Sequence, residues 1–417
     1  PTLSSGGGEG DEVSRRVGFR RPSWPSNSSH VGEYFALLLL ASIGLLLLVS
    51  SEDILLIFLS LELTSLSLYV LTAFDKRSLE SSEAGLKYFL FGGMSAAFIL
   101  FGLSLLYGIS GSTNLREIAA AIHGPRLDPL LLLALVMVLV GLGFKVAAAP
   151  FHLWAPDVYQ GAPVPSAAFI ASGSKVAGFF VLAQVMLVGF KGAEGSMAWG
   201  AFRPGWVAVL ALIAGLSMVV GNLAALVQTS VRRLLAYSAI AHAGYLLLAV
   251  IGANQQTLPA LVYYALTYAV TALGAFGVVG VISGRNRGDR ISDFAGLSRR
   301  EPVLALCMAV FLLSLAGIPP LAGFFGKFYV FSSALRGPVG LALVWLVALA
   351  LGMSAVSLYY YLKVLKAIYV ADLPADALPT PAPAPTLMLV LMILMAGATL
   401  VLGSAPDLLL RFLAATT

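Results

Sequence analysis

Residues 129–163 read PLLLLALVMVLVGLGFKVAAAPFHLWAPDVYQGAP, and this stretch decides how the chain folds. It opens with an apolar run that is long enough for a membrane helix, because about twenty apolar residues cross a bilayer. The run contains one charged residue, Lys145, and is then interrupted by Pro150. Proline lacks the amide donor that a helix interior needs. The stretch therefore predicts a membrane helix that is broken beside a lysine.

The composition of the whole chain agrees with a membrane protein. Of the 417 residues, 59% are apolar and 11% are charged, whereas a soluble domain has about 25% charged residues. The mean hydropathy is +0.92. The single cysteine, Cys307, excludes a disulfide scaffold, and the sequence has no CxxC motif or His-rich cluster to bind zinc or iron–sulfur clusters. The net charge of +5 does not indicate nucleic-acid binding, because in membrane proteins the placement of Lys and Arg matters more than their sum.

Eleven apolar segments follow a polar N-terminal tail. We expect residues 1–30, rich in Gly, Ser and Arg, to be disordered, and residues 31–417 to form one transmembrane domain. The segments lie at 34–50, 54–74, 85–107, 128–149, 166–190, 206–228, 233–251, 258–283, 302–335, 340–370 and 385–404. Each must be helical, because a lipid-exposed backbone has to pair its own amides and the alternation of barrel strands is missing. The fold class predicted is an all-α, polytopic membrane helix bundle.

The basic residues predict the orientation of the bundle. Threading eleven segments back and forth places fifteen Lys and Arg on the face that carries the tail and six on the other face. The first face is therefore expected to be cytoplasmic. The four remaining basic residues all fall inside segments: Lys87, Lys145, Lys175 and Lys327.

Ionisable side chains inside the segments are the strongest functional signal. A Lys or Asp at the centre of a membrane helix costs roughly 2.5–3.5 kcal/mol to insert. Glu62 lies deep in its segment and could form a structural ion pair with one lysine. It is the only carboxylate at such depth, however, so Lys145, Lys175 and Lys327 cannot all be paired with it. Burial without a full set of partners helps a lysine to release its proton. We therefore interpret Glu62 and these three lysines as a proton relay.

Two further candidates have strong structural alternatives. Lys87 lies near the start of its segment, four residues after Glu83, so an interfacial ion pair explains it as well as a relay role does. His242 lies mid-segment and is either a hydrogen-bonded packing residue or a relay member. His152 and Asp157 flank the first break and could line its water access or cap the broken helix.

A second break suggests an internal repeat. Residues 317–320 read GIPP, inside the ninth segment and shortly before Lys327. Broken helices at corresponding places in two halves are typical of inverted-repeat transporters. Lys145 precedes its break, whereas Lys327 follows the second one. This reversal favours inverted, antiporter-like repeats.

At these positions the sequence resembles subunit N of the bacterial NADH–quinone oxidoreductases, the respiratory complex I family. The similarity extends over roughly residues 34–404. The stretches that carry it are 61–69 (LELTSLSLY), 85–90 (GLKYFL), 107–115 (YGISGSTNL), 143–163, 237–245 (YSAIAHAGY) and 319–327 (PPLAGFFGK).

The resemblance implies a membrane-arm, antiporter-like subunit that helps to pump protons. Glu62 and Lys145 would be a coupled pair, Lys175 the connecting site and Lys327 the terminal lysine. The chain itself would bind no cofactor. NADH, FMN, iron–sulfur clusters and quinone would be in other subunits, and the partners would be membrane-arm subunits in a bacterial inner membrane.

The resemblance also implies fourteen spans, of which the three before Tyr34 have no counterpart here, as in a truncated or misassigned start of the reading frame. Two other functions remain open: a subunit of a multisubunit cation/proton antiporter, and a stand-alone secondary transporter. Lysines and apolar groups surround the breaks, whereas a stand-alone transporter would need varied polar groups to bind its substrate there. The sequence contains no nucleophile–base pair and no phosphate-binding loop, so it does not indicate an enzyme that acts alone.

Overall fold

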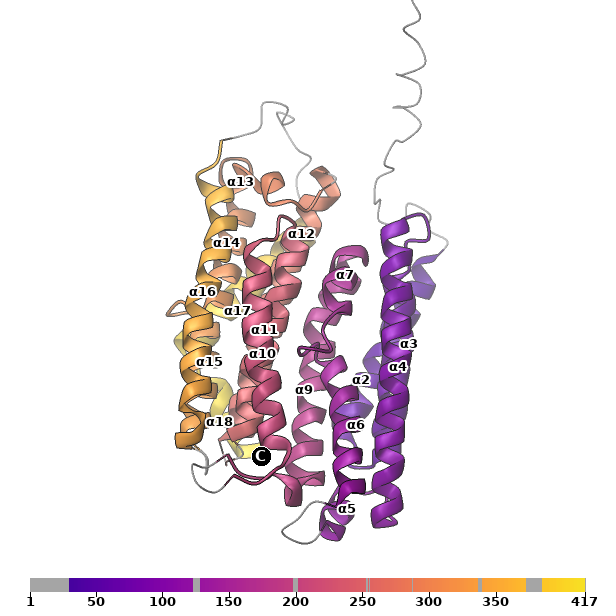
Figure 1. Ribbon diagram of the computed structural model, residues 1–417. Coiled ribbons are helices and arrows are strands. Elements are labelled where there is room, and N and C mark those ends of the chain that lie inside the picture. Colours follow the sequence, from indigo (N-terminus) through magenta and orange to yellow (C-terminus); the bar gives the residue numbers. More distant parts are fainter. Residues whose placement is uncertain are drawn as a thin grey trace, which may run out of the picture.

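The computed structural model describes residues 30–122, 128–197, 202–252, 254, 256–286, 288–336, 340–372 and 385–416. Residues 1–29 of the expected tail lie outside this part of the chain. Within it, helices stand side by side in a bundle, and those at the two ends of the sequence lie on opposite sides (Figure 1). The predicted all-α fold is confirmed.

All eleven predicted segments are helical in the described part of the chain, but they are of two kinds. Nine are long and apolar enough to cross a membrane. They are α2 (Val31–Ser50), α3 (Ile54–Thr72), α4 (Leu79–Ser110), the stretch Val164–Gly189, α10 (Trp206–Leu226), α11 (Val231–Gly252), α12 (Thr257–Asn286), α16 (Val344–Tyr369) and α17 (Thr386–Ser404).

The other two segments are divided into half-helices, as the prolines predicted. The segment expected at 128–149 contains only α6 (Pro129–Lys145), and its second half, α7 (Trp154–Gly161), lies beyond the predicted bounds. The segment expected at 302–335 becomes α14 (Pro302–Ala316) and α15 (Ala322–Arg336). Helix α6 ends five residues before Pro150, and α14 ends three residues before Pro319. Lys145 is consequently the last residue of α6 and not an interior residue of a span.

Backbone geometry explains where these half-helices stop. After α6, Ala147 has φ 55°, a left-handed conformation that a right-handed helix cannot continue. After α14, Gly317 has φ 90°, and its amide bonds to the carbonyl of Leu313. Glycine adopts such a φ without steric cost, so the sequence provides a helix end at this point.

Counting segments reveals the inverted repeat. The divided segments are the fourth and the ninth of eleven, so equivalent elements are five crossings apart. Because five is odd, the second unit must run in the opposite direction across the bundle. Figure 1 shows α6 below α7 in the first unit, but α14 above α15 in the second. We call α2 to α9 the first repeat and α10 to α16 the second repeat.

Loops that the threading placed together do meet in the structure. At one end an isolated bridge joins Ser230 to Arg290. At the other end Arg116 forms two hydrogen bonds of 2.8 Å with Glu52, and these bonds lower the pKa of that exposed carboxyl. The threading is thus supported, while the cytoplasmic assignment of the first end stays a prediction.

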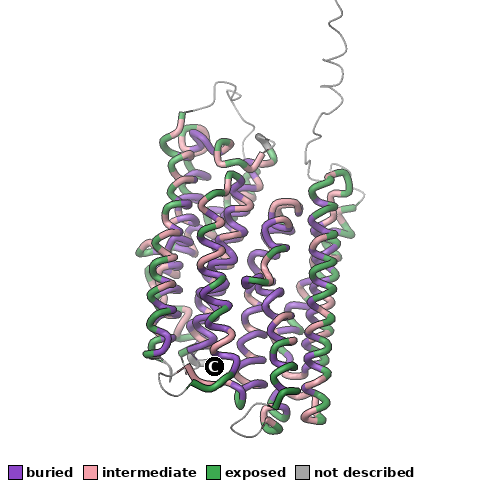
Figure 2. Tube along the Cα trace, viewed as in Figure 1, coloured by how far each residue is buried: buried purple, intermediate pink, exposed green. Residues whose placement is uncertain are grey.

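The interior of the bundle is centred on α11. Almost all of its residues are buried, whereas α2, α4 and α17 keep large apolar side chains exposed on their outer faces. Figure 2 shows buried residues, in purple, mainly along the central helices and exposed residues, in green, along the outer ones. Helix α11 lies against α7, α10, α12 and α15. It is therefore the element through which the two repeats can communicate.

Three short helices were missed by the sequence analysis. They are α5 (Leu115–Ala121), α13 (Leu297–Arg300) and α18 (Asp407–Thr416). Each lies at an end of the bundle, where no long apolar run marks it. The stretch Val164–Gly189 also proved irregular, because α8 (Val164–Phe169) and α9 (Lys175–Gln184) are joined and followed by π-turns at Ile170–Ser174 and Val185–Gly189.

Candidate functional site

The first predicted pair, Glu62 and Lys145, lies between α3 and the end of α6. The Lys145 ammonium is buried and donates to the hydroxyl of Ser65 at 3.3 Å. Glu62 precedes Ser65 by three residues and therefore shares its helix face. The two charges act on each other, yet among the described residues the Glu62 carboxylate forms no ion pair within 4.0 Å. The structure brings the pair into Coulomb range without direct contact.

Lys175 begins α9 directly after the π-turn at Ile170–Ser174. Its ammonium is buried, donates to the backbone carbonyl of Ala239 in α11 at 2.5 Å, and lies 6.0 Å from the ring centroid of Tyr268. π-turns are rare and occur frequently at functional sites. No feature of the sequence had indicated this one, which places an irregular backbone beside a buried lysine.

Lys327 of α15 has the fullest set of partners. Its ammonium donates to the carbonyls of Leu315 and Ala316 at 3.0 and 2.9 Å, and to the Ser354 hydroxyl at 2.7 Å. The two carbonyls are the last ones of α14, which have no acceptor role inside their own helix. The negative end of the α14 dipole also favours a cation there. The break thus supplies the site that holds the lysine.

Close approach of the backbone requires a glycine at this break. A Cβ atom on Gly317 would lie 3.1 Å from Cδ and 3.3 Å from Nζ of Lys327. Both contacts are tighter than ordinary packing. Gly317 therefore serves two purposes: it ends α14 with a positive φ and leaves room for the lysine side chain.

His242 of α11 is buried between the two lysines of the interior. Its Nδ1 lies 2.7 Å from the Tyr264 hydroxyl and its Nε2 lies 3.4 Å from that of Tyr361. Both Lys175 and Lys327 are within Coulomb range of the imidazole. The bonds to these two tyrosines agree with the first interpretation of His242, that of a hydrogen-bonded packing residue. A relay role for His242 stays a prediction.

Several polar residues around this centre were missed. Asn222 of α10 is fully buried, donates to the Tyr245 hydroxyl at 3.1 Å and accepts from the Tyr360 hydroxyl at 3.0 Å. The ring of Tyr245 in turn lies under the Lys327 ammonium, 5.2 Å from its centroid. The signal available in the sequence was Asn222 itself, an amide side chain in the middle of an apolar run.

Lys87 is separate from the other lysines. Its side chain is 39% exposed and pairs with Glu83, as the spacing predicted, and also with Asp157 of α7, both at 2.7 Å. This arrangement is the ion-pair alternative of the sequence analysis. Asp157 serves Lys87 rather than capping a helix, and His152 lies half-buried in the turn between α6 and α7. A relay role for Lys87 stays a prediction.

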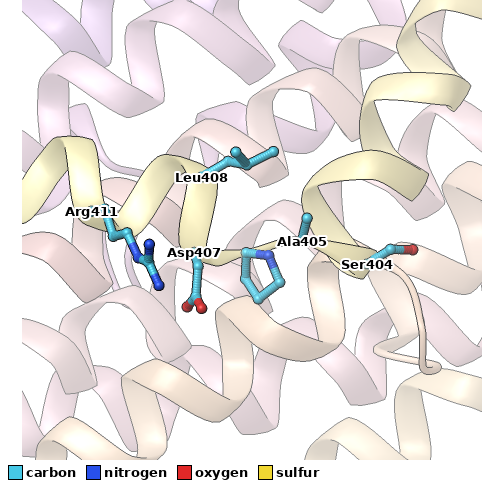
Figure 3. A pocket seen from close by; sticks show the side chains of 6 residues that line it. Ser404, Ala405, Asp407, Leu408 and Arg411 are labelled. Atoms are coloured by element: carbon cyan, nitrogen blue, oxygen red, sulfur yellow. The ribbon is translucent and has the colours of Figure 1, made fainter.

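A surface pocket exists elsewhere, at the junction of α17 and α18. Figure 3 shows it near the C-terminal end, lined by Ser404, Ala405, Pro406, Asp407, Leu408 and Arg411. None of these residues contacts the buried lysines in the part of the chain that the structure describes. In the same described ranges no three His, Cys, Asp or Glu side chains are placed to hold a metal ion.

Comparison with known proteins defines the class to which this fold and site belong. Residues 51–354 match the family described as NADH:quinone oxidoreductase/Mrp antiporter, TM. The chain is 58% identical to NADH-quinone oxidoreductase subunit N 2 of Acidobacterium capsulatum over 93% of this chain and 77% of that protein. It is 43% identical to subunit N 1 of Roseiflexus castenholzii over 92% and 73%, respectively.

Solved structures agree with the sequence relatives. A chain of respiratory complex I from Thermus thermophilus aligns with a TM-score of 0.75 and 42% identity, covering 91% of this chain and 79% of that one. A chain of the Mrp complex from Dietzia sp. aligns with a TM-score of 0.79 over 91% and 76%, but at 22% identity, so it shows a shared fold only. The chain belongs to the NADH:quinone oxidoreductase/Mrp antiporter membrane-subunit family and, within it, to the subunit N proteins of NADH–quinone oxidoreductases.

Proposed function

We propose that this chain is a proton-translocating membrane subunit of an NADH–quinone oxidoreductase and moves protons through a relay of Glu62, Lys145, Lys175, His242 and Lys327. The membership in the subunit N family supports the first part of the proposal. The relay rests on one observation: half-buried Glu62 in the first repeat is followed by buried ionisable side chains, Lys145, Lys175, His242 and Lys327, that continue into the second repeat.

The continuity can be followed from helix to helix. The stem of Lys145 passes against α9 at Gly178, where an added Cβ would lie 3.4 Å from the Lys145 Cγ. Lys175 lies on the same helix, one turn away, and bonds to α11 through Ala239. His242 follows Ala239 on α11 by three residues and interacts with both Lys175 and Lys327. The helices that carry Lys145, Lys175, His242 and Lys327 thus contact one another in that order, which supports the proposed path.

Partner sets suggest where the proton is held most firmly. An ammonium has three N–H donors, and Lys327 has three acceptors, so its site suits the charged form. Lys175 has one acceptor and Lys145 has one at the longer distance of 3.3 Å. An ammonium that lacks acceptors in a buried site tends to release its proton. The number of acceptors increases from Lys145 and Lys175 to Lys327, and this increase favours proton transfer toward Lys327. The charge of Glu62 opposes release of the proton from Lys145.

Electrostatic coupling provides the switch in this scheme. When the Glu62 carboxylate is charged and near, it stabilises the Lys145 ammonium; when the two separate, that stabilisation is lost. At a separation of about 7 Å and an effective dielectric near 20, the coupling is roughly 2.4 kcal/mol. A change of that size is sufficient to redistribute a proton, because about 1.4 kcal/mol corresponds to a tenfold change in an equilibrium constant.

The remaining chemistry is assigned to partners. NADH oxidation and quinone reduction would take place in other subunits, which would hold NADH, FMN, iron–sulfur clusters and quinone. This chain would act as a non-redox subunit of the translocase, next to other membrane-arm subunits in a bacterial inner membrane. A role in a cation/proton antiporter is less well supported, because the Mrp chain is 22% identical whereas the subunit N relative is 58% identical.

Replacement of Glu62 by glutamine tests the relay. Glu62→Gln keeps the shape of the side chain and removes its charge, so proton pumping by the assembled complex should fall by about tenfold or more, because a positioned proton-transfer group contributes on the order of 10²–10⁴-fold to the step that it serves. NADH-driven proton uptake in proteoliposomes measures this. The matched control is Glu52→Gln, at an exposed loop carboxylate, which should pump at the parental rate. Parental pumping by a fully assembled Glu62→Gln complex would contradict the relay.

A further inference from the structure

A compact charge cluster joins the two repeats at α7. The Asp157 carboxylate accepts from Lys87 of α4 through Oδ2 at 2.7 Å and from Arg233 of α11 through Oδ1 at 2.6 Å. Arg233 also donates to the Gln160 side chain at 3.1 Å. Each oxygen of one carboxylate is thus bound to a cation from a different repeat. We call Asp157, Lys87 and Arg233 the α7 clamp.

The neighbouring arginine holds the same helix at its C-terminal end. Arg232 donates to the carbonyl of Tyr159 at 3.0 Å and to the carbonyl of Ala162. These carbonyls lie at the end of α7, where a helix has unpaired acceptors and favours a nearby cation. Two consecutive arginines of α11 therefore fasten both a side chain and the backbone of α7.

Helix α7 needs such restraints because it is short and detached. It has eight residues and follows the turn at 146–153. Isolated helices of this length are unstable in water, since nucleation is costly and few bonds repay it. Its packing against α4 and α11 and the α7 clamp must therefore determine its position.

The first residue of α7 contacts the backbone beside Lys145. Trp154 stacks on Tyr88 of α4, with ring centroids 4.5 Å apart, and its indole N–H donates to the carbonyl of Phe144 at 3.2 Å. Phe144 directly precedes Lys145 at the end of α6. A shift of α7 would therefore pull on the peptide that carries this lysine.

We infer that Asp157 is a positioning residue: by binding Lys87 and Arg233 at once, it fixes α7 between the repeats and thereby orients the end of α6 at Lys145. This role rests on the proposed relay function of Lys145. It also gives Lys87 a role at the edge of the bundle, through its bond to Asp157. The clamp connects Lys145 mechanically to α11, which carries His242.

The experiment combines pumping with thiol reactivity in the assembled complex. In a Cys307→Ser background, the Ala148→Cys variant places a thiol in the turn before α7, where Ala148 is fully buried. Adding Asp157→Asn should make that thiol more reactive toward a water-soluble maleimide and lower the pumping rate roughly three- to tenfold, equivalent to about 0.7–1.4 kcal/mol. Asp157→Glu, which restores the charge, should recover most of both.

The matched control is Asp372→Asn, because Asp372 also pairs with an arginine, Arg299, but is exposed and far from α7 in the sequence. It should change neither readout. Unchanged thiol reactivity in Asp157→Asn overturns the clamp, and so does raised reactivity with parental pumping. Parental pumping by Glu62→Gln would instead contradict the relay itself, so the two failures are distinguishable.

Discussion

The two repeats carry ionisable residues at equivalent places but surround them with different hydrogen-bond partners. Each places an ionisable residue in its second segment and a lysine in its fourth: Glu62 with Lys145 in the first repeat, and His242 with Lys327 in the second. The first pair has one long hydrogen bond to a serine, whereas in the second pair Lys327 has three acceptors and His242 has two tyrosine hydroxyls. In the proposed relay, the site with more acceptors would retain a proton and the site with fewer would release it.

The breaks differ in the same sense. In the second repeat the lysine sits on the half-helix after the break and reaches back to the freed carbonyls of α14. In the first repeat the lysine is itself the last residue of α6 and points to a serine of another helix. Inverted topology alone therefore does not produce equivalent sites. The side of the break that carries the lysine determines which acceptors it can reach.

The largest expected effect comes from removing each lysine. Both Lys327→Met and Lys145→Met should reduce pumping by about tenfold or more, because each removes a proton-transfer group. Their effects on stability should differ, because Lys327→Met removes the donor of three hydrogen bonds and leaves the Leu315 carbonyl unpaired, while the Ala316 carbonyl keeps only a 3.5 Å bond from Ser354. An unpaired buried polar group costs about 1–3 kcal/mol. Lys145→Met removes only one hydrogen bond, the one to the Ser65 hydroxyl.

Heating followed by native gel electrophoresis measures how much assembled complex each variant retains. Lys327→Met should disassemble at a lower temperature than the parental complex, whereas Lys145→Met should not. If Lys145→Met proves the less stable of the two, the contrast between a satisfied and an unsatisfied lysine site is wrong.

A smaller effect is expected from the residues that end the half-helices. Gly317→Ala adds a Cβ at φ 90° and close to Lys327, so we expect a loss of roughly 1–3 kcal/mol in stability together with slower pumping. Ala147 holds φ 55° with a Cβ already present. Ala147→Gly should be close to neutral, because relief of left-handed strain offsets the entropy that glycine loses on folding.

Thermal stability and pumping of the two variants, measured in parallel, test this asymmetry. A harmless Gly317→Ala would show that α15 and Lys327 can move to accept the methyl group. It would also show that the close approach of Gly317 to Lys327 does not limit which residue can end α14.

The sequence contains most of the fold, because apolar runs and prolines act locally. The eleven segments and both divided helices were predictable from them. The end of α6 was not predictable, because it depends on a left-handed φ at Ala147, a residue type that rarely adopts it, whereas Gly317 marks the end of α14 in the sequence. The π-turn before Lys175 was equally hidden, since residues 170–174 are ordinary in type.

The ionisable residues of the site were predictable from the sequence, but the side chains that contact them were not. Lysines and a glutamate inside apolar segments are conspicuous because lipid excludes them. Tyr264 and Tyr361 are not, because tyrosine is common in membrane helices, and their contacts with His242 come from helices distant in sequence. For Lys87, the partner four residues away was evident, whereas Asp157 required the fold to bring α7 against α4.

The smallest and most discriminating effect concerns the two serines that receive the lysines. Ser354 accepts from Lys327 at 2.7 Å and Ser65 accepts from Lys145 at 3.3 Å. Hydrogen bonds to charged groups contribute about 1.5–3 kcal/mol at good geometry and much less when long. Ser354→Ala should therefore slow pumping by roughly three- to tenfold, whereas Ser65→Ala should stay within about twofold of the parental rate. Ser→Ala in both cases removes one hydroxyl and little volume, so each variant controls for the other.

Initial rates of NADH-driven proton uptake at matched complex concentration measure the difference. Equal effects of the two substitutions would mean that Lys145 and Lys327 depend alike on their serines, and the proposed gradient of proton retention between the repeats would have to be abandoned.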